Sequence, residues 1–406
     1  MCTCKTLHNF IINDNTIWRN ICRRGLVIQN PLNSEADSKP WYERCKISHN
    51  WRKGIYLNKV ILHHDTLYMP WLEFHESKNL LLSLGSDLCC FSTNQRGLPD
   101  CRRTLWALEV PTVKRYDVRT NDISRFVIRD NIIVCGNRDG CIAIYLFNTP
   151  TRRPLLLCHK DDCHHSGQVE VTAVEGIKTT SSLCVVTGSQ KSSELCMWSW
   201  HFTDDENLYE EQNMNCRRKY IKLGRDVGVR CLATNSSKGK FAVGLTGYNR
   251  PLVLDYNTCN LLTPFDKAWR GKVAIRDIQW HDESTVTYVT HSGMLYLWDT
   301  RANNVVYSAM DTFQSSLYCV RTDNNNVLLA GTSEYSRCVL FDKRRQGRHV
   351  QMYYTQKKSS PIYSLAFSSS TLIAAADRSM AFLDFNVNPA TVRRRDYSHI
   401  FEFVKR

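Results

Sequence analysis

Short apolar runs separated by polar turns recur along most of the chain, and the clearest example lies between Ile275 and Arg301. Three runs, Ile275–Trp280, Thr285–Thr290 and Met294–Asp299, are rich in β-branched and aromatic residues, and polar residues fill the gaps between them. Runs of about five or six such residues with short polar turns are typical of antiparallel strands in a meander. The stretch therefore predicts a three-stranded unit.

The same three-run unit can be laid along the chain seven times. The first runs begin at Met69, Ile123, Val169, Val229, Ile275, Leu317 and Ile362. The third runs end near Phe91, Leu146, Trp200, Asp255, Asp299, Asp342 and Asp384. Most steps between units fit the repeat of about 40–45 residues expected for a propeller blade, and the longer ones contain polar insertions such as Asp204–Asn215. The pattern predicts an all-β, seven-bladed β-propeller.

The outer edge of the last blade is the one place where the pattern leaves a gap. Most units are followed by a further apolar run, but Pro389 and Arg393–Arg395 follow the seventh. The run Ile55–Leu62, upstream of the first unit, has no blade of its own. Because an unpaired strand edge is a liability, we predict that Ile55–Leu62 is the outer strand of the last blade and closes the ring. The tail Tyr397–Arg406 is the alternative occupant of that edge.

The first 26 residues follow a helical period. Two short amphipathic helices are predicted, one carrying Leu7 and Phe10 and the next carrying Ile17 and Trp18. Helices of this length do not fold alone, so they must pack on the rest of the chain or on a partner. The predicted division is 1–26 for these helices, 27–54 for an irregular linker packed on the propeller, 55–386 for the propeller, and 387–406 for a C-terminal tail.

Composition places the chain among ordinary globular proteins. Of its 406 residues, 43% are hydrophobic and 23% charged. No apolar run reaches the roughly 18 residues of a membrane span, and the start lacks the order of a signal peptide. A cytoplasmic and/or nuclear protein is expected, and in those compartments the 18 cysteines are expected to be reduced thiols.

The net charge of +14 favours acidic partners. The basic residues form short clusters on predicted loops, such as Arg217–Lys219 and Lys343–Arg345, and no cluster forms a stripe interleaved with aromatic residues. Scattered charge of this kind is typical of solvated loops. Nucleic-acid binding is therefore the least favoured function.

Several short motifs along the chain carry a family resemblance. Three lie in the N-terminal helices: Cys4–Leu7, Phe10-Ile11 and Thr16–Arg19. Four lie later in the chain: Ser48–Arg52, Met69–Trp71, Trp298-Asp299 and Ser315–Cys319. Together they resemble the F-box and WD40-repeat family. The repeats are degenerate, since only one blade keeps Trp-Asp. The resemblance begins inside the F-box, after its Leu-Pro-containing helix, and implies a partial F-box, truncated at its N-terminus, over 1–26.

The resemblance implies a substrate-recognition subunit of an SCF-type (Skp1–cullin–F-box) ubiquitin ligase. The F-box would dock on Skp1 and thereby on the cullin scaffold, and the propeller would present a target protein for ubiquitination and degradation. The chain is then a non-catalytic adaptor with no cofactor, and the sequence contains neither a Gly-rich phosphate loop nor G-x-S-x-G. A second possibility is a non-ligase WD40 scaffold for protein–protein interaction, whose helices only cap the ring.

Candidate partner-binding residues of the partial F-box are Leu7, Phe10, Ile17 and Trp18. The alternative is that these apolar side chains pack on the linker and the propeller.

Candidate target-binding residues come from the second position of each first strand. In blade order these residues are Pro70, Ser124, Glu170, Arg230, Arg276, Tyr318 and Tyr363. First strands are innermost in propellers of this family, so the seven should ring one mouth of the central channel. Arg230 and Arg276 beside Tyr318 and Tyr363 suit the binding of phosphate or carboxylate, which predicts an acidic or phosphorylated target. The alternative is internal pairing of the arginines with Glu170, Asp226 or Asp277.

Two further motifs have weaker support. Cys158-His159 and Cys163–His165 cluster soft ligands, but their spacing does not match paired C-x-x-C zinc ligands, and no metal site is predicted. Trp298–Arg301 resembles the WDxR box by which some propellers dock on the DDB1 adaptor of cullin-4 ligases. The alternative for Arg301 is a bond to neighbouring loops.

Overall fold

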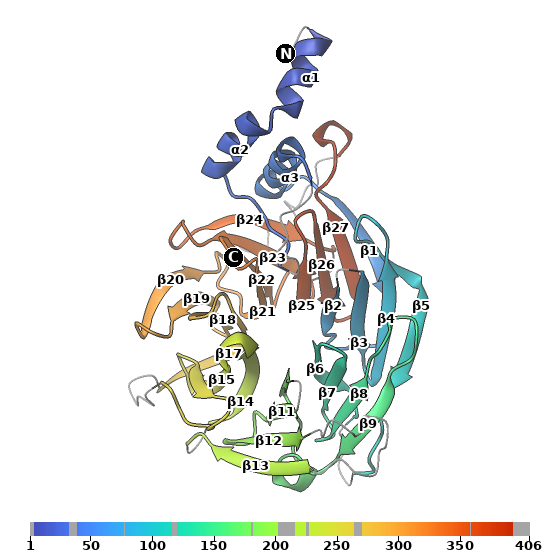
Figure 1. The fold of residues 1–406 in the computed structure, drawn as a ribbon, viewed down its shortest axis with the longest axis vertical. Helices are drawn as coiled ribbons and strands as arrows, with labels where there is room; N and C mark the ends of the chain where they lie inside the picture. Colours follow the sequence, from blue (N-terminus) through green and yellow to red (C-terminus); the bar gives the residue numbers. More distant parts are fainter. Residues whose placement is uncertain are drawn as a thin grey trace.

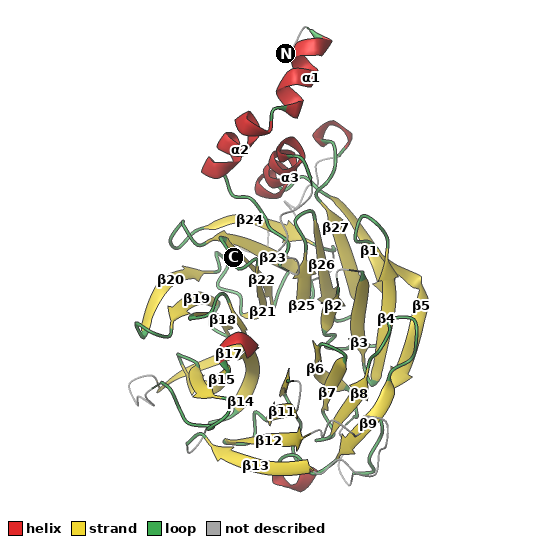
Figure 2. Ribbon diagram, viewed as in Figure 1, coloured by secondary structure: helices red, strands yellow, loops and turns green. Residues whose placement is uncertain are grey.

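The computed structural model describes residues 4–31, 39–76, 78–115, 120–179, 182–201, 216–224, 227–263, 270–357 and 359–392. Antiparallel sheets are arranged in a ring, and three helices lie at one side of it (Figure 1). Figure 2 shows how far strands dominate the chain. None of the described helices is long and apolar enough to span a bilayer.

The first three blades each contain four consecutive strands in simple order. Blade 1 is β2 (Leu72–His75), β3 (Asn79–Leu84), β4 (Asp87–Thr93) and β5 (Pro99–Glu109). Blade 2 is β6 (Ile123–Arg129), β7 (Ile132–Asn137), β8 (Ile142–Leu146) and β9 (Leu155–Lys160). Blade 3 is β10 (Ala173–Lys178), β11 (Ser182–Gly188), β12 (Glu194–His201) and β13 (Cys216–Lys222).

Blades 4 and 5 share one seven-stranded sheet. Blade 4 is β14 (Val229–Asn235), β15 (Lys240–Tyr248) and β16 (Leu252–Asp255), and blade 5 is β17 (Arg270–Trp280), β18 (Thr285–Thr290), β19 (Met294–Asp299) and β20 (Asn304–Met310). The two join because β17 begins at Arg270, before the predicted Ile275, and its early residues pair with β15.

The last two blades differ in the origin of their outer strand. Blade 6 is β21 (Leu317–Thr322), β22 (Val327–Thr332), β23 (Arg337–Asp342) and β24 (His349–Tyr354). Blade 7 is β25 (Ile362–Phe367), β26 (Thr371–Ala376), β27 (Ser379–Asp384) and β1 (Leu57–His63). β1 pairs antiparallel with β27 from Leu57↔Asp384 to His63↔Ser379, which is the position predicted for Ile55–Leu62. The tail Tyr397–Arg406, which was the alternative occupant of this edge, lies outside the described residues.

Packing explains the apolar pattern of the middle strands. Every residue of β22 and β26 is buried because neighbouring blades cover both faces of each sheet. Outer strands face solvent on one side, so β13 buries only Ile221 among its seven residues. The predicted first runs at Met69 and Val169 start a few residues before β2 and β10, which begin at Leu72 and Ala173.

The prediction of an irregular linker over 27–54 is wrong for its second half, which contains α3 (Trp41–Lys53). Pro40 precedes this helix, and Gly54 ends it with a left-handed φ of 66°. Its buried side includes Ser48 and Asn50, so it shows no apolar stripe in the sequence. Asn50 Nδ2 instead donates to the carbonyls of Phe385 and Val387, at 2.8 and 3.0 Å.

The helices α1 (Lys5–Asn13) and α2 (Asn15–Arg24) project from the ring beside α3 (Figure 1). The Asp14 side chain caps α2 by accepting from the N–H groups of Thr16 and Ile17. A disulfide joins Cys22 of α2 to Cys45 of α3, so the prediction of reduced thiols is wrong for this pair. Three 3₁₀ turns, 165–167, 236–238 and 389–391, complete the described elements.

Candidate functional site

The central channel contains two cavities at opposite ends of the inner strands. One, the strand-start mouth, has a volume of about 350 Å³ and includes Tyr363 near the start of β25. The other, the strand-end cavity, has a volume of about 300 Å³ and includes Phe367 at the end of β25. Trp71 and Arg125 line both, and therefore separate them.

The structure places all seven second-position residues in the lining of the strand-start mouth. They are Pro70, Ser124, Glu170, Arg230, Arg276, Tyr318 and Tyr363. Met69, Arg138, Thr172 and Gln190 complete the rim with Trp71 and Arg125. Arg138 and Gln190 lie in turns after second strands, where the sequence shows only polar residues and no distinguishing signal.

In five of the seven blades a β-bulge points the second-position side chain into this mouth. The register of the inner pair shifts between Val229 and Cys231 in blade 4 and between Ile275 and Asp277 in blade 5. Blades 2, 6 and 7 show the same shift around Ser124, Tyr318 and Tyr363. A bulge leaves one residue unpaired and redirects its side chain. Glycine in the second strand of blade 4 makes room for the residue after the bulge, since a Cβ at Gly244 would lie 2.3 Å from the Cys231 sulfur.

The two arginines of the mouth are half-buried and short of acceptors. The Arg276 guanidinium donates to His291 Nδ1 at 3.2 Å and lies over the Tyr318 ring at 4.5 Å. The Nε atoms of Arg230 and Arg276 are both buried without a hydrogen-bond acceptor. Burial, and then the charge of Arg276, lower the pKa of Arg230. Two guanidinium groups that line one cavity and repel each other favour an added anion.

The acids proposed as internal partners of the arginines are engaged elsewhere. Asp277 binds Arg125 at 3.0 Å and Arg321 at 3.1 Å. Glu170 accepts from Gln190 Nε2 at 2.6 Å. Asp226 lies outside the described residues, and within the described ranges no carboxylate forms an ion pair with Arg230 or Arg276.

The two tyrosines form the next part of the rim. The rings of Tyr318 and Tyr363 lie 5.7 Å apart and are tilted by 49°. Burial, followed by the neighbouring Tyr318, raises the pKa of Tyr363, so its hydroxyl stays protonated and can donate to an anion. The mouth therefore combines two guanidinium groups with two phenols, as the alignment of blades predicted.

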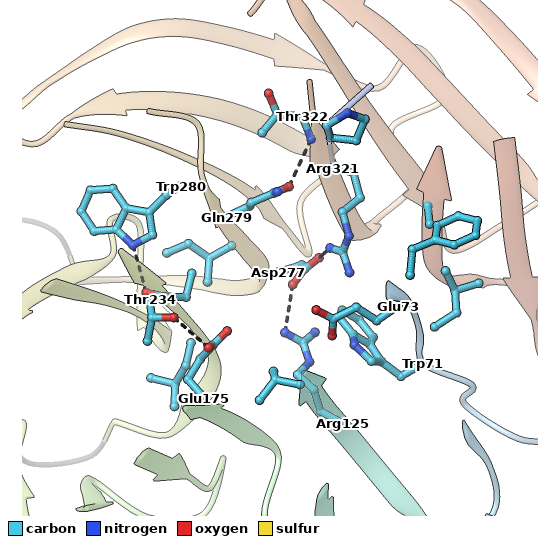
Figure 3. Close-up of a pocket in the computed structure, with 18 of the residues that line it drawn as sticks. Trp71, Glu73, Arg125, Glu175, Thr234, Asp277, Gln279, Trp280, Arg321 and Thr322 are labelled. Atoms are coloured by element: carbon cyan, nitrogen blue, oxygen red, sulfur yellow. Dashed lines mark hydrogen bonds and ion pairs between the residues drawn. The ribbon is translucent and has the colours of Figure 1, made fainter. Parts of the chain in front are cut away.

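Charged side chains from five blades line the strand-end cavity (Figure 3). Trp71 has the guanidinium groups of Arg125 and Arg321 over its ring, at 3.8 and 4.8 Å, and Asp277 accepts from both arginines. Arg129, also in the lining, binds Glu175 at 2.6 Å and Glu73 at 3.5 Å. No sequence motif indicates this cluster, because its members are spread over separate blades.

The partial F-box candidates are mostly exposed. Leu7, Phe10 and Ile17 expose 52%, 66% and 39% of their surface, so they do not pack on the linker or the propeller. Trp18 is half-buried, packs edge-on against Tyr42 at 5.0 Å, and donates from Nε1 to the Ile11 carbonyl. Ile21 adds a further exposed apolar side chain to α2, at 53%.

The two weaker motifs show ordinary contacts. Cys163 is buried, and the His164 Nε2 lies 3.0 Å from the Thr187 hydroxyl. Within the described ranges no three His, Cys, Asp or Glu side chains are grouped to hold a metal ion. In the Trp298–Arg301 motif, Trp298 is fully buried, and the Arg301 guanidinium, 75% exposed, lies 3.5 Å from Asp299.

Solved structures with the same architecture support the fold. Raptor from Chaetomium thermophilum superposes with a TM-score of 0.59 at 17% identity, over 81% of this chain and 28% of that one. Sqt1 from Saccharomyces cerevisiae superposes with a TM-score of 0.53 at 15% identity, over 76% of this chain and 81% of that one. The chain is a WD40-type β-propeller. No family model matches it.

Two curated relatives match almost the whole sequence. F-box/WD repeat-containing protein 4 of mouse is 24% identical over 394 residues, and its human counterpart is 25% identical over the same length. Each match covers 95% of this chain and 87% of the relative. The sequence motifs quoted above predict a resemblance to that protein, also called dactylin, in particular. At this identity the matches support a relationship to the F-box/WD-repeat family and do not equate the two proteins.

Proposed function

We propose that the chain is the substrate-recognition subunit of an SCF-type E3 ubiquitin ligase, located in the cytoplasm and/or nucleus. The strand-start mouth binds an acidic or phosphorylated segment of a target protein, and the helices α1 and α2 bind Skp1 and through it the cullin scaffold. Ubiquitin transfer takes place on other subunits, so the chain itself acts as a non-catalytic adaptor. The division into 1–26, 27–54, 55–386 and 387–406 is part of this proposal.

The observation that carries the target-binding role is that Arg230 and Arg276 line the same mouth and form no ion pair with a carboxylate within the described ranges. An oxyanion at the mouth would supply acceptors and offset the repulsion between the two guanidinium groups. Charge-assisted hydrogen bonds of this kind are about twice as strong as neutral ones. The tyrosine hydroxyls at the next two blades extend the donor set.

The exposed apolar surface of α1 and α2 supports the docking role. Leu7, Phe10, Ile17 and Ile21 are exposed large hydrophobic residues within two short helices. The helix α3, which packs against α2, contacts Ser369 beyond the end of β25. Tyr363 of the mouth lies at the start of the same strand. A target and a ligase scaffold could therefore bind at the same time without competing for one surface.

Replacing both mouth arginines is expected to abolish target recognition. We expect Arg230→Ala plus Arg276→Ala to weaken binding by at least about a hundredfold, since each lost charged hydrogen bond costs about 1.5–3 kcal/mol. The ligands are phosphoserine and glutamate peptides that the wild-type chain retains from an array, and affinity is measured by fluorescence anisotropy. Arg217→Ala, at an exposed site on β13, is the matched control. Unchanged affinity in the double variant would contradict the proposal.

Polar substitutions on the helices are expected to remove Skp1 binding without affecting the mouth. Phe10→Asp plus Ile17→Asp should reduce Skp1 affinity at least tenfold, because each places a charge where an apolar contact is proposed. The control is Asn20→Ala on the exposed face of α2. Calorimetry with purified Skp1 and with a mouth-binding peptide separates the two surfaces. Equal Skp1 affinity in both variants would favour the scaffold function instead.

A cullin-4 ligase adaptor is the second candidate, and the observation in its favour is the exposed Arg301 side chain. Its guanidinium makes one long contact to Asp299 and is otherwise available to a partner such as DDB1. Arg301→Ala should then remove DDB1 from immunoprecipitates and leave Skp1 in place. Under the SCF proposal, Phe10→Asp plus Ile17→Asp should instead remove Skp1 from immunoprecipitates and leave any bound DDB1 in place.

A further inference from the structure

The strand-end cavity holds one carboxyl group that is poorly paired. Arg129 is shared by two acids, and its short contact of 2.6 Å goes to Glu175. Glu175 also accepts from the Thr234 hydroxyl at 2.9 Å. Glu73 is held by the longer ion pair to Arg129 at 3.5 Å and by a backbone hydrogen bond from Ile128, and 28% of its side chain is exposed. An ionised carboxylate can accept about four hydrogen bonds, so Glu73 has room for another donor.

The charges that line the cavity are balanced, but they are unevenly paired. Three arginines and three acids line it, and Arg125 and Arg321 share Asp277 at 3.0 and 3.1 Å. Of the three acids, Glu73 has the longest ion pair, at 3.5 Å to Arg129. The inner strands of blades 4 and 7 also line the cavity, through Thr234 and Ala366, and these two side chains carry no charge.

The walls of the cavity suit a cation on an apolar stem. Phe74, Ile278, Trp280 and Phe367 line it together with the charged groups. Lys and Arg side chains lie along apolar surfaces in this way while their charged ends reach polar groups. The volume of about 300 Å³ is at the lower end of the range for ligand sites. Asn324 in the lining is exposed, so the cavity reaches the surface at the end opposite the arginine mouth.

We infer that the strand-end cavity is a second binding site, which takes a guanidinium or ammonium group against Glu73. The group comes from an Arg or Lys side chain of a partner's extended segment, or from a small free amine. This site is independent of the proposed target-binding mouth and has the opposite charge preference. It would allow the propeller to bind a basic segment at one end of the channel while an acidic one occupies the other.

Proton release should accompany binding at this site. Burial raises the pKa of Glu73 to about 7. The positive charges of Arg129 and Arg321 oppose this shift, and the negative charge of Glu175 adds to it. At pH 6 about a tenth of the carboxyl groups are then ionised and at pH 8 about nine-tenths. A cation binds the ionised form, so affinity should rise roughly tenfold from pH 6 to pH 8.

The test uses the full chain with three probes: acetyl-Gly-Arg-Gly-amide, acetyl-Gly-Lys-Gly-amide and methylguanidinium. Calorimetry at pH 6, 7 and 8, in buffers of different ionisation enthalpy, measures affinity and proton release. We expect saturable binding, a roughly tenfold gain over this range, and loss of both the gain and the proton release in Glu73→Gln. Stronger binding of the peptides than of methylguanidinium identifies an Arg or Lys side chain as the ligand. Binding of methylguanidinium alone identifies a small free cation.

Two controls keep the outcome independent of folding and of the proposed function. The melting temperature of Glu73→Gln shows whether the variant is folded, and Arg276→Ala at the other mouth should bind all three probes as the wild type does. The inference is overturned if no probe binds, or if folded Glu73→Gln keeps the affinity and pH profile of the wild type. Preferential binding of acetyl-Gly-Glu-Gly-amide, an anion, would also overturn it.

Discussion

Replacing Asp311 with alanine is expected to lower the free energy of unfolding by about 3–5 kcal/mol, because it leaves the Arg337 charge buried without a partner. Both side chains are fully buried, and the two carboxylate oxygens accept from the guanidinium at 2.7 and 2.8 Å. The same carboxylate accepts the backbone N–H groups of Phe313 and Ser315. Urea unfolding followed by tryptophan fluorescence measures the loss.

The structure offers a matched control and a rescue for this variant. Lys238 and Glu283 form an exposed pair at 2.9 Å, and Glu283→Ala should cost no more than about 1 kcal/mol. Asp311→Leu combined with Arg337→Met removes both charges together and should recover much of the stability. If Asp311→Ala cost no more than Glu283→Ala, the buried pair would not contribute as described. The loop fixed by Asp311 leads directly into β21, so the variant should also weaken peptide binding through Tyr318.

Replacing Trp51 with alanine is expected to cost about 3–5 kcal/mol and to detach α3 from the propeller. The Trp51 ring is fully buried, stacks on Phe385 with centroids 3.6 Å apart, and meets Tyr353 edge-on at 5.4 Å. Its Nε1–H donates to the Ser369 carbonyl at 3.0 Å. Alanine would lose this packing and leave that carbonyl without its partner.

Hydrogen exchange of α3 measures the second part of this effect. Trp51→Ala should raise exchange in α3 and α2 more than in the inner strands, because α2 packs against α3. His49→Ala, an exposed change on the same helix, is the control and should leave exchange unchanged. Protection of α3 at the wild-type level in Trp51→Ala would show that other contacts, such as those of Asn50, are sufficient to dock the helix.

The apolar pattern predicted the propeller because each blade repeats the same physical requirement. Middle strands such as β22 are covered on both faces, so they appear in the sequence as continuous apolar runs. The residues of the strand-start mouth could be predicted from the sequence for a related reason. The bulge around Arg230 recurs at the equivalent point of four other blades, so aligning the first runs also aligns the side chains that face the channel.

Features that depend on contacts between distant blades were not predictable in this way. The helix α3 was missed because Ser48 and Asn50 on its buried side satisfy backbone carbonyls rather than form an apolar stripe. The strand-end cavity was missed because Glu73, Arg129 and Glu175 each look like a polar position facing solvent in an alternating strand. Only the closed ring brings these three together.

The pairing of β1 with β27 also determines when the molecule can be completed. Leu57 cannot find its partner until Asp384 has been made, so the last blade joins residues from almost the whole length of the chain. Contacts of such high contact order form slowly, because the loop must close before the contacts stabilise it. During synthesis, β1 and the neighbouring α3 therefore stay unpaired with the seventh blade until that blade has left the ribosome. A nascent or prematurely terminated chain would lack the surfaces that hold the N-terminal helices in place, so those helices can dock only after the chain has been made through Asp384.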